Sequence, residues 1–343
     1  MLDGEDFAAL TDPFRAELLA HCYRMLGSVQ DAEDQVQETL IRAWRSYGDF
    51  EGRSSVRTWL YRIATNACLR ALENSSRRPL PSGLGTPSDD PAAPLAAQQP
   101  EVPWLQPIPD VLVTAGSADP AAIVTSRTSM RLALIAALQY LPARQRAVLI
   151  LRDVLQWQAA EVAELLGVTT IAVNGMLQRA RARLSEAAPA EDDIHEPASP
   201  GDRALADRYA AAFENADIAG LTELLRADAV IEMPPLPTWF AGRAAGMAFL
   251  QAQVLREPGQ FRLLPTSANG QPAFAVYLRE GDGVYRAHGI VVLSIAASLV
   301  TRVTMFMEPG LLATFGLPSA LPAAGDLAGA PGDGPDGTAA PGR

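Results

Sequence analysis

The most specific chemistry in this 343-residue chain lies in residues 160–184, AEVAELLGVTTIAVNGMLQRARARL. Asn174, Gln178 and Arg179 are spaced to share the outer face of one helix. Asn and Gln side chains pair with adenine, and Arg pairs with guanine, in the major groove of DNA. Arg181 follows nearer the C-terminal end, where phosphate contact is easier. The segment predicts a DNA-reading helix, and an ordinary helical hairpin with a solvated Arg face is the alternative.

A helix-turn-helix is predicted to position these side chains. Gln158 to Leu166 form its first helix, and Gly167 lies at the turn, where a positive φ costs glycine little. Thr169 can cap the second helix. The buried stripe of that helix is predicted at Val173, Met176, Leu177, Ala180 and Leu184, which leaves Ile171, Asn174, Gly175, Gln178 and Arg179 facing outward.

Two polar helix faces are predicted near the N-terminus. In DAEDQVQETLIRAW, Asp34, Glu38 and Arg42 recur at i, i+4 spacing, which is either a solvated face or a docking surface for a helical partner. In SSVRTWLYRIATNACLRAL, a basic face without acidic neighbours suits phosphate or single-strand contact. That second helix places Trp59, Ile63 and Leu69 at burial spacing and Arg57, Thr58, Arg62, Asn66 and Arg70 on the polar face.

The composition limits the class of protein. The net charge is −11, so nucleic acid would have to bind local basic faces rather than a uniform basic field. Cys22 and Cys68 are predicted to be reduced thiols rather than a disulfide framework. The N-terminus has no apolar signal core, and the longest apolar stretch, GIVVLSIAASLV, is too short to span a bilayer. We therefore expect a soluble, cytoplasmic protein without a membrane partner.

The chain divides by composition into helical, Pro-rich and mixed segments. Residues 79–120 hold ten prolines, whereas residues 127–186 are helical by pattern with eight arginines and four acidic residues. The predicted organisation is a helical domain at 5–78, a Pro-rich linker at 79–126, a helix-turn-helix domain at 127–186, an acidic linker at 187–201, an α+β domain at 202–316 and a disordered tail at 317–343.

Both helical domains resemble a known family. DAEDQVQETLIRAWRSYGDF with VRTWLYRIATNACL is similar to region 2 of the sigma-70 family, and residues 141–184 are similar to region 4. No region 3 is recognisable between them, which is typical of the extracytoplasmic-function (group 4) sigma factors of bacterial RNA polymerase. The resemblance covers residues 8–78 and 127–186 and implies two all-α domains. Gly175 departs from the pattern, because such sequences often carry Ser there.

The resemblance implies the roles of particular residues. Core polymerase and promoter DNA are the implied partners, with the β′ clamp helices and the β flap as the contact points on the polymerase. The loop 49–56 would help to open and read the −10 element. The implied residues are Asp31, Asp34, Gln35, Glu38 and Arg42 for polymerase docking; Arg57, Thr58, Tyr61, Arg62 and Asn66 for the −10 element; and Thr170, Ile171, Asn174, Gly175, Gln178, Arg179 and Arg181 for the −35 element.

Residues 203–310 resemble a different family. DRALADRYAAAFENADIAGLTELL predicts two helices, and four later runs predict a curved antiparallel sheet. This order is similar to the SnoaL-like cone folds, in which helices close a bent sheet around a pocket. We expect a non-catalytic regulator, because the domain has one histidine and no paired carboxylates at obvious spacing. The candidate pocket residues are Met233, Trp239, Phe240, Tyr277 and His288, and a catalytic site would draw on His288, Tyr277, Glu232 or Trp239.

Two rival functions remain open at this point. One is a ligand-sensing DNA-binding regulator that acts without polymerase, and the other is a cone-fold enzyme fused to a vestigial sigma region. No metal site and no cofactor are expected. A small-molecule ligand or an anti-sigma protein is a candidate partner. The linker segment VPWLQPIPD is predicted to dock on one of the domains, because exposure of the apolar side chains of Trp104, Leu105 and Ile108 to water is unfavourable.

Overall fold

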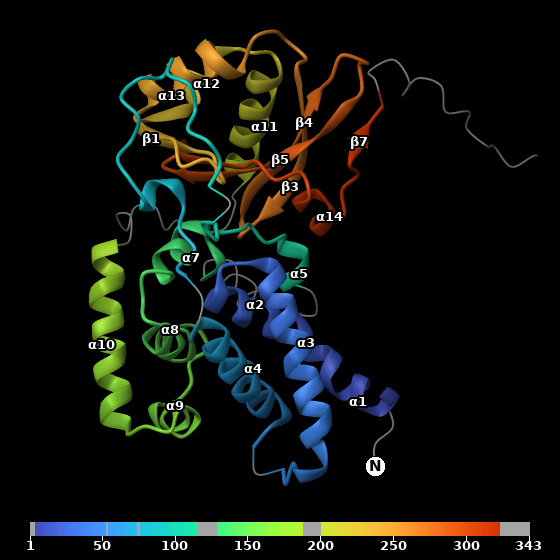
Figure 1. Ribbon diagram of the computed structural model, residues 1–343, viewed down its shortest axis with the longest axis vertical. Coiled ribbons are helices and arrows are strands. Elements are labelled where there is room, and N and C mark those ends of the chain that lie inside the picture. Colours follow the sequence, from blue (N-terminus) through green and yellow to red (C-terminus); the bar gives the residue numbers. More distant parts are fainter. Residues whose placement is uncertain are drawn as a thin grey trace, which may run out of the picture.

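The computed structural model describes residues 4–52, 54–73, 76–99, 101–114, 129–187 and 200–322. Figure 1 shows a helical half below and a sheet flanked by helices above. The predicted tail beyond residue 322 and the predicted acidic linker at 188–199 lie outside the described residues. The strand β7 extends the upper half past residue 316, to Leu321.

The N-terminal helical unit begins and ends its helices at recognisable signals. Gly27 ends α2 with a φ of 72°, and Ser28 caps α3 by accepting a hydrogen bond from the Asp31 amide (3.2 Å). His21 of α2 contacts Thr65 of α4 through a 2.9 Å hydrogen bond. The helices are α1 (Gly4–Thr11), α2 (Arg15–Leu26), α3 (Val29–Ser46) and α4 (Val56–Glu73), with short 3₁₀ turns at Asp12–Phe14 and Tyr47–Asp49.

The helix-turn-helix forms as its local signals predict. Gln158 and Glu161 make a reciprocal capping box at the start of the first helix. Gly167 ends that helix at φ 64°, and the Thr169 hydroxyl caps the next helix through the Ala172 amide. The helices of this unit are α7 (Leu132–Leu138), α8 (Ala143–Leu149), which continues as a π-helical turn at Ile150–Val154, α9 (Ala159–Leu166) and α10 (Thr170–Ala187).

The upper half is an α+β domain built on a mixed sheet of order β2-β1-β6-β5-β4-β3, with β7 paired to β5. The four strands β3 to β6 are antiparallel as predicted, whereas β1 and β6 run parallel. The elements are α11 (Pro200–Glu214), α12 (Ile218–Leu224), β1 (Leu225–Glu232), β2 (Trp239–Ala241), α13 (Arg243–Phe249) with a π-helical turn η6 (Leu250–Val254), β3 (Phe261–Ala268), β4 (Gln271–Arg279), β5 (Tyr285–Ala296), β6 (Leu299–Phe306), α14 (Leu311–Thr314) and β7 (Ala320–Leu321).

The two faces of the sheet belong to two different cores. Successive side chains of a strand point to opposite faces. Val276 and Val291 therefore join the interior of the α+β domain, whereas Tyr277 and Ile290 belong to a second cluster that continues into the helical half. The helical units and the α+β domain thus share a continuous apolar core rather than meeting across a purely polar interface.

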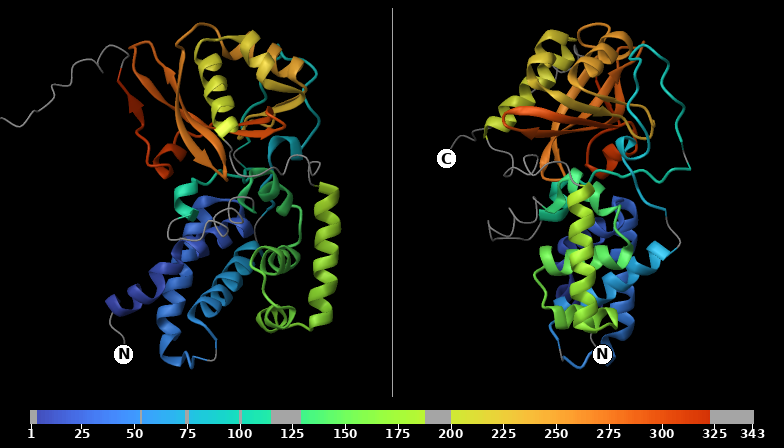
Figure 2. Two further views of the ribbon diagram at one scale, coloured as in Figure 1. Left: turned by 180° about the vertical axis from the view of Figure 1, so that it is seen from behind. Right: turned by 90° about the vertical axis from the view of Figure 1, so that its left-hand side faces the viewer.

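The Pro-rich linker is ordered along much of its length. Residues 84–99 follow the side of the α+β domain, as the cyan trace in Figure 2 shows. The Ser88 amide bonds to the Trp239 carbonyl (2.8 Å), and the Trp239 indole bonds to the Gly85 carbonyl (3.1 Å). Farther on, Leu105 and Ile108 are fully buried, and Trp104 is half-buried, before the short helix α5 (Asp110–Thr114). The predicted docking of this segment is therefore confirmed, with Leu105 and Ile108 as its anchors.

Candidate nucleic-acid interface

The outer face of α10 is open to solvent. Of the predicted buried stripe, Val173, Leu177 and Ala180 are buried against the rest of the helix-turn-helix unit. The other two members, Met176 and Leu184, are only half-buried. Ile171 is 83% exposed, and Asn174, Gln178 and Arg179 are exposed on the same side. Arg181 is held by Asp153 through two hydrogen bonds of 2.7 and 2.9 Å. The helix therefore presents amide and guanidinium groups that can enter a major groove.

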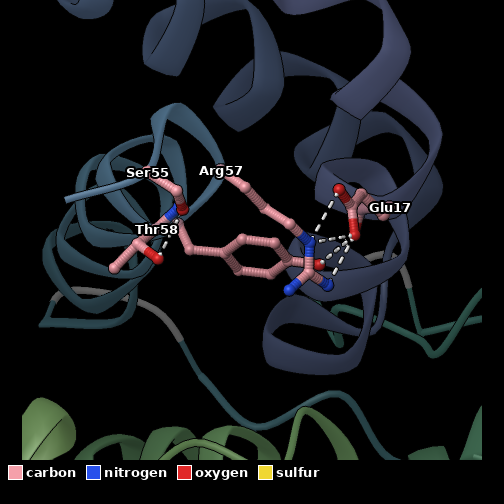
Figure 3. A network of polar contacts seen from close by, with 5 residues as sticks. Glu17, Ser55, Arg57 and Thr58 are labelled. Atoms are coloured by element: carbon pink, nitrogen blue, oxygen red, sulfur yellow. Dashed lines mark hydrogen bonds and ion pairs between the residues drawn. The ribbon is translucent and has the colours of Figure 1, made fainter. Parts of the chain in front are cut away.

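The basic face of α4 is partly occupied by the protein itself. Figure 3 shows Arg57 reaching from α4 to Glu17 of α2, where it makes a bidentate contact of 2.7 to 3.0 Å. The hydrogen bond with Glu17 raises the pKa of Arg57. Tyr61 lies 1% exposed beneath this pair, and burial raises the pKa of its phenol. Thr58 and Asn66 are half-buried.

The face of α4 also contacts the helix-turn-helix unit directly. Arg62 donates to Glu164 of α9 at 2.6 Å, and the rings of Tyr61 and Trp157 meet edge-to-face with centroids 6.0 Å apart. Arg146 of α8 donates to the Met25 carbonyl of α2, and the remaining hydrogen bonds of its guanidinium go to Gln139 and Leu141. Two candidate DNA-binding helices therefore lie in one compact body.

The polar stripe of α3 lies on the surface. Asp34 is exposed, Gln35 is half-buried, and Glu38 pairs with Arg42 at 2.5 Å. Asp31 pairs with Arg78 at the start of the linker. The large apolar side chains of Ile41 and Trp44 are 46% and 45% exposed on the same helix, a feature that the polar periodicity did not reveal. Polar and apolar groups together give α3 the mixed composition of a protein-docking surface.

One β-turn connects the three parts of the molecule. Asn269, at the tip of the β3–β4 hairpin, accepts from the Ile108 amide (3.1 Å). It donates to the Tyr23 hydroxyl and to the Met130 carbonyl, both at 2.8 Å. Asp110 accepts from the neighbouring Gly270 amide at 2.7 Å, and Gln271 accepts from the Leu132 amide at 2.9 Å. We call Asn269, Gly270 and Gln271 with these partners the hairpin joint.

Three known protein families match successive parts of this chain. The Sigma-70 region 2 family matches residues 10–78, the Sigma-70 region 4 family matches residues 131–184, and the SnoaL-like domain family matches residues 206–303. The ECF RNA polymerase sigma factor SigG of Mycobacterium tuberculosis (strain ATCC 25618 / H37Rv) is 54% identical over 318 residues, which cover 92% of this chain and 85% of SigG.

The chain belongs to the ECF sigma factors of RNA polymerase. The probable ECF sigma factor SigI of the same strain is 25% identical over 300 residues, covering 87% of this chain and 92% of SigI. The crystal structure of M. tuberculosis SigJ has the same fold, with a TM-score of 0.61 and 22% identity, over 92% of this chain and 100% of that one. The expected resemblance and the expected fold class are thus both confirmed.

In this sigma factor the buried stripe of α4 differs from the sequence prediction. Trp59, Ile63 and Leu69 were expected to be buried, but each is only half-buried. Leu60, Ala64 and Cys68 are instead fully buried, with exposures of 0%. The helix packs against α2 and α3 on one side and against α8 on another, so its buried surface is wider than one stripe. The most deeply buried positions are therefore not those of the three large side chains.

The SnoaL-like domain encloses an apolar cavity whose lining corrects the predicted pocket. Met233 and His288 line the cavity as expected, but Trp239, Phe240 and Tyr277 do not. Phe240 fills the core by stacking on Phe249, with centroids 4.5 Å apart. Tyr277 points to the opposite face of the sheet, where it donates to the Pro318 carbonyl. Trp239 faces the linker.

The candidate catalytic groups of the SnoaL-like domain are dispersed. Glu232 is fully buried but lies away from the cavity, where it accepts from Arg302 (2.7 Å), Thr304 (3.2 Å) and the Ser82 amide of the linker (3.2 Å). His288 is the one member of the predicted catalytic set that reaches the cavity. The carboxylate therefore serves to hold the linker rather than to meet a substrate.

Among the described residues no group of three or more His, Cys, Asp or Glu side chains could hold a metal ion. Within the same ranges no single helix is long and apolar enough to cross a membrane, although the bent pair α9 and α10 passes that test together.

Sequence reasoning missed the hairpin joint and the linker contacts of the SnoaL-like domain. The dipeptide Asn269-Gly270 is a hairpin signal, and both residues have positive φ (57° and 66°). That signal predicts the turn but not its partners, which lie up to 246 residues away.

Proposed function

We propose that this ECF sigma factor rests in a compact form and opens to initiate transcription. As a member of the family it binds core RNA polymerase and directs it to promoter DNA in the cytoplasm. The observation that carries the proposal is the direct contact between Arg62, on the helix assigned to the −10 element, and Glu164, on the helix-turn-helix assigned to the −35 element.

The physical argument rests on distance. Sites centred near −10 and −35 are roughly 25 base pairs apart, which is roughly 85 Å along B-form DNA. The α10 helix is only about 27 Å long. Because Arg62 and Glu164 are 2.6 Å apart in the compact form, both elements cannot be read together until α4 and α9 separate. Core polymerase supplies the binding free energy for that separation when it binds the two domains apart.

The SnoaL-like domain is proposed as the regulator in cis of this opening. Its hairpin joint binds region 2 through Tyr23, the linker through Ile108 and Asp110, and region 4 through Met130 and Leu132. A turn bound to all three parts stabilises only the arrangement in which all three are together. The domain therefore favours the compact form, and the direction of control is restraint.

The C-terminal domain is proposed to be non-catalytic. The cavity lining has no carboxylate, and its titratable groups are Tyr209 and His288. The docking surface on α3, with Asp34, Gln35, Glu38 and the exposed Trp44, favours a polymerase partner over a regulator that acts on DNA alone. The assigned docking, −10 and −35 residues remain part of this proposal.

Labelled protein tests the opening. Arg70 on α4 and Arg183 on α10 are exposed, and Cys22 and Cys68 are buried, so R70C and R183C offer two reactive thiols on the full chain. We expect energy transfer between dyes at these sites to be high in the free protein and to fall when core polymerase and promoter are added. An unchanged transfer efficiency in a complex that transcribes would contradict the proposal.

A further inference from the structure

The cavity of the SnoaL-like domain has a volume of about 100 Å³ and lies between the sheet, α11 and η6. Aliphatic, aromatic and methionine side chains make up nearly all of its lining, and none of the lining residues carries a charge at neutral pH. Apolar cavities of about 150 Å³ stay free of water and take up molecules of the size of benzene. At about 100 Å³ the cavity is smaller than that, so its lining suits a small organic molecule that gains the remaining space by displacing a lining side chain.

Two polar side chains in the lining have no partner. Tyr209 is 2% exposed and His288 is half-buried, and neither the Tyr209 hydroxyl nor the imidazole of His288 makes a hydrogen bond among the described residues. For Tyr209, whose side chain is almost fully buried, a missing hydrogen-bond partner costs stability. Burial raises the pKa of Tyr209 and lowers that of His288, so both are neutral near pH 7. A charged guest would find no counter-charge here, whereas a neutral polar atom would find a partner.

One residue of the lining comes from outside the domain. Leu95, in the middle of the Pro-rich linker, lines the cavity. The linker is tied down on both sides of it, because Gln253 of η6 donates to the Pro91 and Ala93 carbonyls (2.7 and 2.9 Å) and the Ala96 amide donates to Thr238 (3.1 Å). Leu95 thus closes the cavity while its neighbours hold the linker on the domain.

We propose that the cavity binds a small uncharged molecule with a hydrocarbon body and one hydroxyl or carbonyl group that pairs with Tyr209. The guest competes with Leu95 for the cavity and so loosens the linker. The coupling of binding to opening rests on the proposed restraint of the sigma regions by this domain. A guest can shift that equilibrium only as far as it binds the loosened form more tightly than the closed one.

The binding site is tested on the full chain with three probes of one shape. Toluene has only the hydrocarbon body, 4-methylphenol adds a hydroxyl, and 4-methylbenzoate adds a charge. We expect 4-methylphenol to bind about fivefold more tightly than toluene, as one hydrogen bond allows, and 4-methylbenzoate not to saturate. Equal affinity of the phenol and the benzoate, or no saturable binding of either neutral probe by calorimetry, would overturn the proposal.

Two matched variants locate the site. Y209F keeps the ring and should abolish the preference for 4-methylphenol while toluene still binds; a preference that persists would contradict the pairing with Tyr209. L95A should bind the larger probe 2-naphthol about tenfold more tightly than the wild type, because the plug is gone. L84A makes the same change at an exposed leucine of the same linker and should leave 2-naphthol binding unchanged. Equal affinities of L95A and L84A would exclude Leu95 as the plug.

The coupling is tested separately from the proposed opening. Saturating 4-methylphenol should lower the energy transfer between dyes at R70C and R183C in the absence of polymerase. If the probe binds and the transfer stays high, the coupling is wrong. The proposed opening is judged by the same dyes with polymerase and no probe, so failure of one proposal is distinguishable from failure of the other.

Discussion

The two helices assigned to DNA differ in how far the protein itself covers them. On α10 the predicted reading residues Asn174, Gln178 and Arg179 are exposed. On α4 Tyr61 is buried, Arg57 is bound to Glu17 and Arg62 is bound to Glu164. In the compact form the helix assigned to the −35 element is thus exposed, whereas part of the helix assigned to the −10 element is bound by other residues of the chain.

The difference indicates that restraint of the half that contains α4 is sufficient to restrain the sigma factor. Under the proposed assignment, a factor with α4 held in this way would present α10 to duplex DNA without engaging the −10 element. The buried side of α10 packs mainly on α7, α8 and α9 of region 4, which leaves its other side exposed. The following predictions test this contrast, from the largest expected effect to the smallest.

Low pH should destabilise the N-terminal helical unit, which contains α4, more than it destabilises region 4. His21 of α2 donates through Nε2 to Thr65 of α4, since the Thr65 hydroxyl itself donates to the Tyr61 carbonyl. Burial, reinforced by Arg24, lowers the pKa of His21 to about 3. The unfolded chain, with a pKa near 6.5, takes up the proton first, so stability present above pH 6.5 is lost as the pH falls toward 3.

The expected loss attributable to His21 is about 1.4 kcal/mol of unfolding free energy per pH unit below 6.5. Chemical denaturation at pH 6.5 and pH 5 measures it, and H21Q should remove about 2 kcal/mol of the difference. Region 4 contains no histidine, so no corresponding loss of unfolding free energy from a buried imidazole is expected there. An unchanged pH dependence in H21Q would show that His21 is not the group that titrates.

Removing the Asn269 side chain should open the compact form. N269G keeps the positive φ permitted but deletes three hydrogen bonds in a buried joint. We expect the compact form to lose about 2–4 kcal/mol relative to the open form, because the buried partners are left unpaired. The R70C and R183C dyes measure this without polymerase. N215A, at an exposed asparagine just after the end of α11, is the control: it deletes only a local hydrogen bond and should leave the compact form unchanged.

Arg179 should matter at one base pair only. If it reads a guanine, R179A costs about 1–3 kcal/mol at that base and relaxes the preference there. Run-off transcription with core polymerase on a library of −35 sequences measures it. R181A, at the neighbouring arginine that is expected to contact phosphate, should weaken all promoters alike. Uniform loss in R179A would instead identify Arg179 as a phosphate contact.

The Arg62–Glu164 pair should give opposite signs for its two partners. The pair is exposed, with side-chain exposures of 42% and 70%, so it contributes only about 0.2–1 kcal/mol. E164Q releases Arg62 and should raise transcription slightly, whereas R62A should lower it, because the arginine is then missing from the promoter complex. If both variants lower transcription equally, the pair is not a cover of the −10 surface.

The features that depend on residues close together in the sequence were predicted correctly, whereas some that depend on distant residues were not. Gly167, Thr169 and Val173 were placed correctly because a turn, a cap and a helical period each depend on a few neighbouring residues. The prediction that Tyr277 lines the pocket was wrong for the opposite reason. A strand's alternation indicates that Val276 and Tyr277 face opposite sides, but which side is the cavity depends on strands that lie far away in sequence.

The linker shows a second limit. Its proline content predicted a segment unable to fold alone, which is compatible with the structure, since its order comes from contacts with residues such as Trp239 and Gln253 of the SnoaL-like domain. Leu95 sits among alanines and prolines and has no periodicity to mark it as a core residue. Asn269 likewise is one polar residue among many until three separate segments are brought to it.

The docked linker is also a reserve of chain length. The 58 residues between α4 and α7 could reach about 190 Å when fully extended, which is ample for the roughly 85 Å between promoter elements. As a relaxed coil the same stretch would average only roughly 40 Å. A linker released from the domain would therefore act as a weak entropic spring in the promoter complex. It would pull regions 2 and 4 together again once the polymerase lets them go, and thus make each round of transcription end in the compact form.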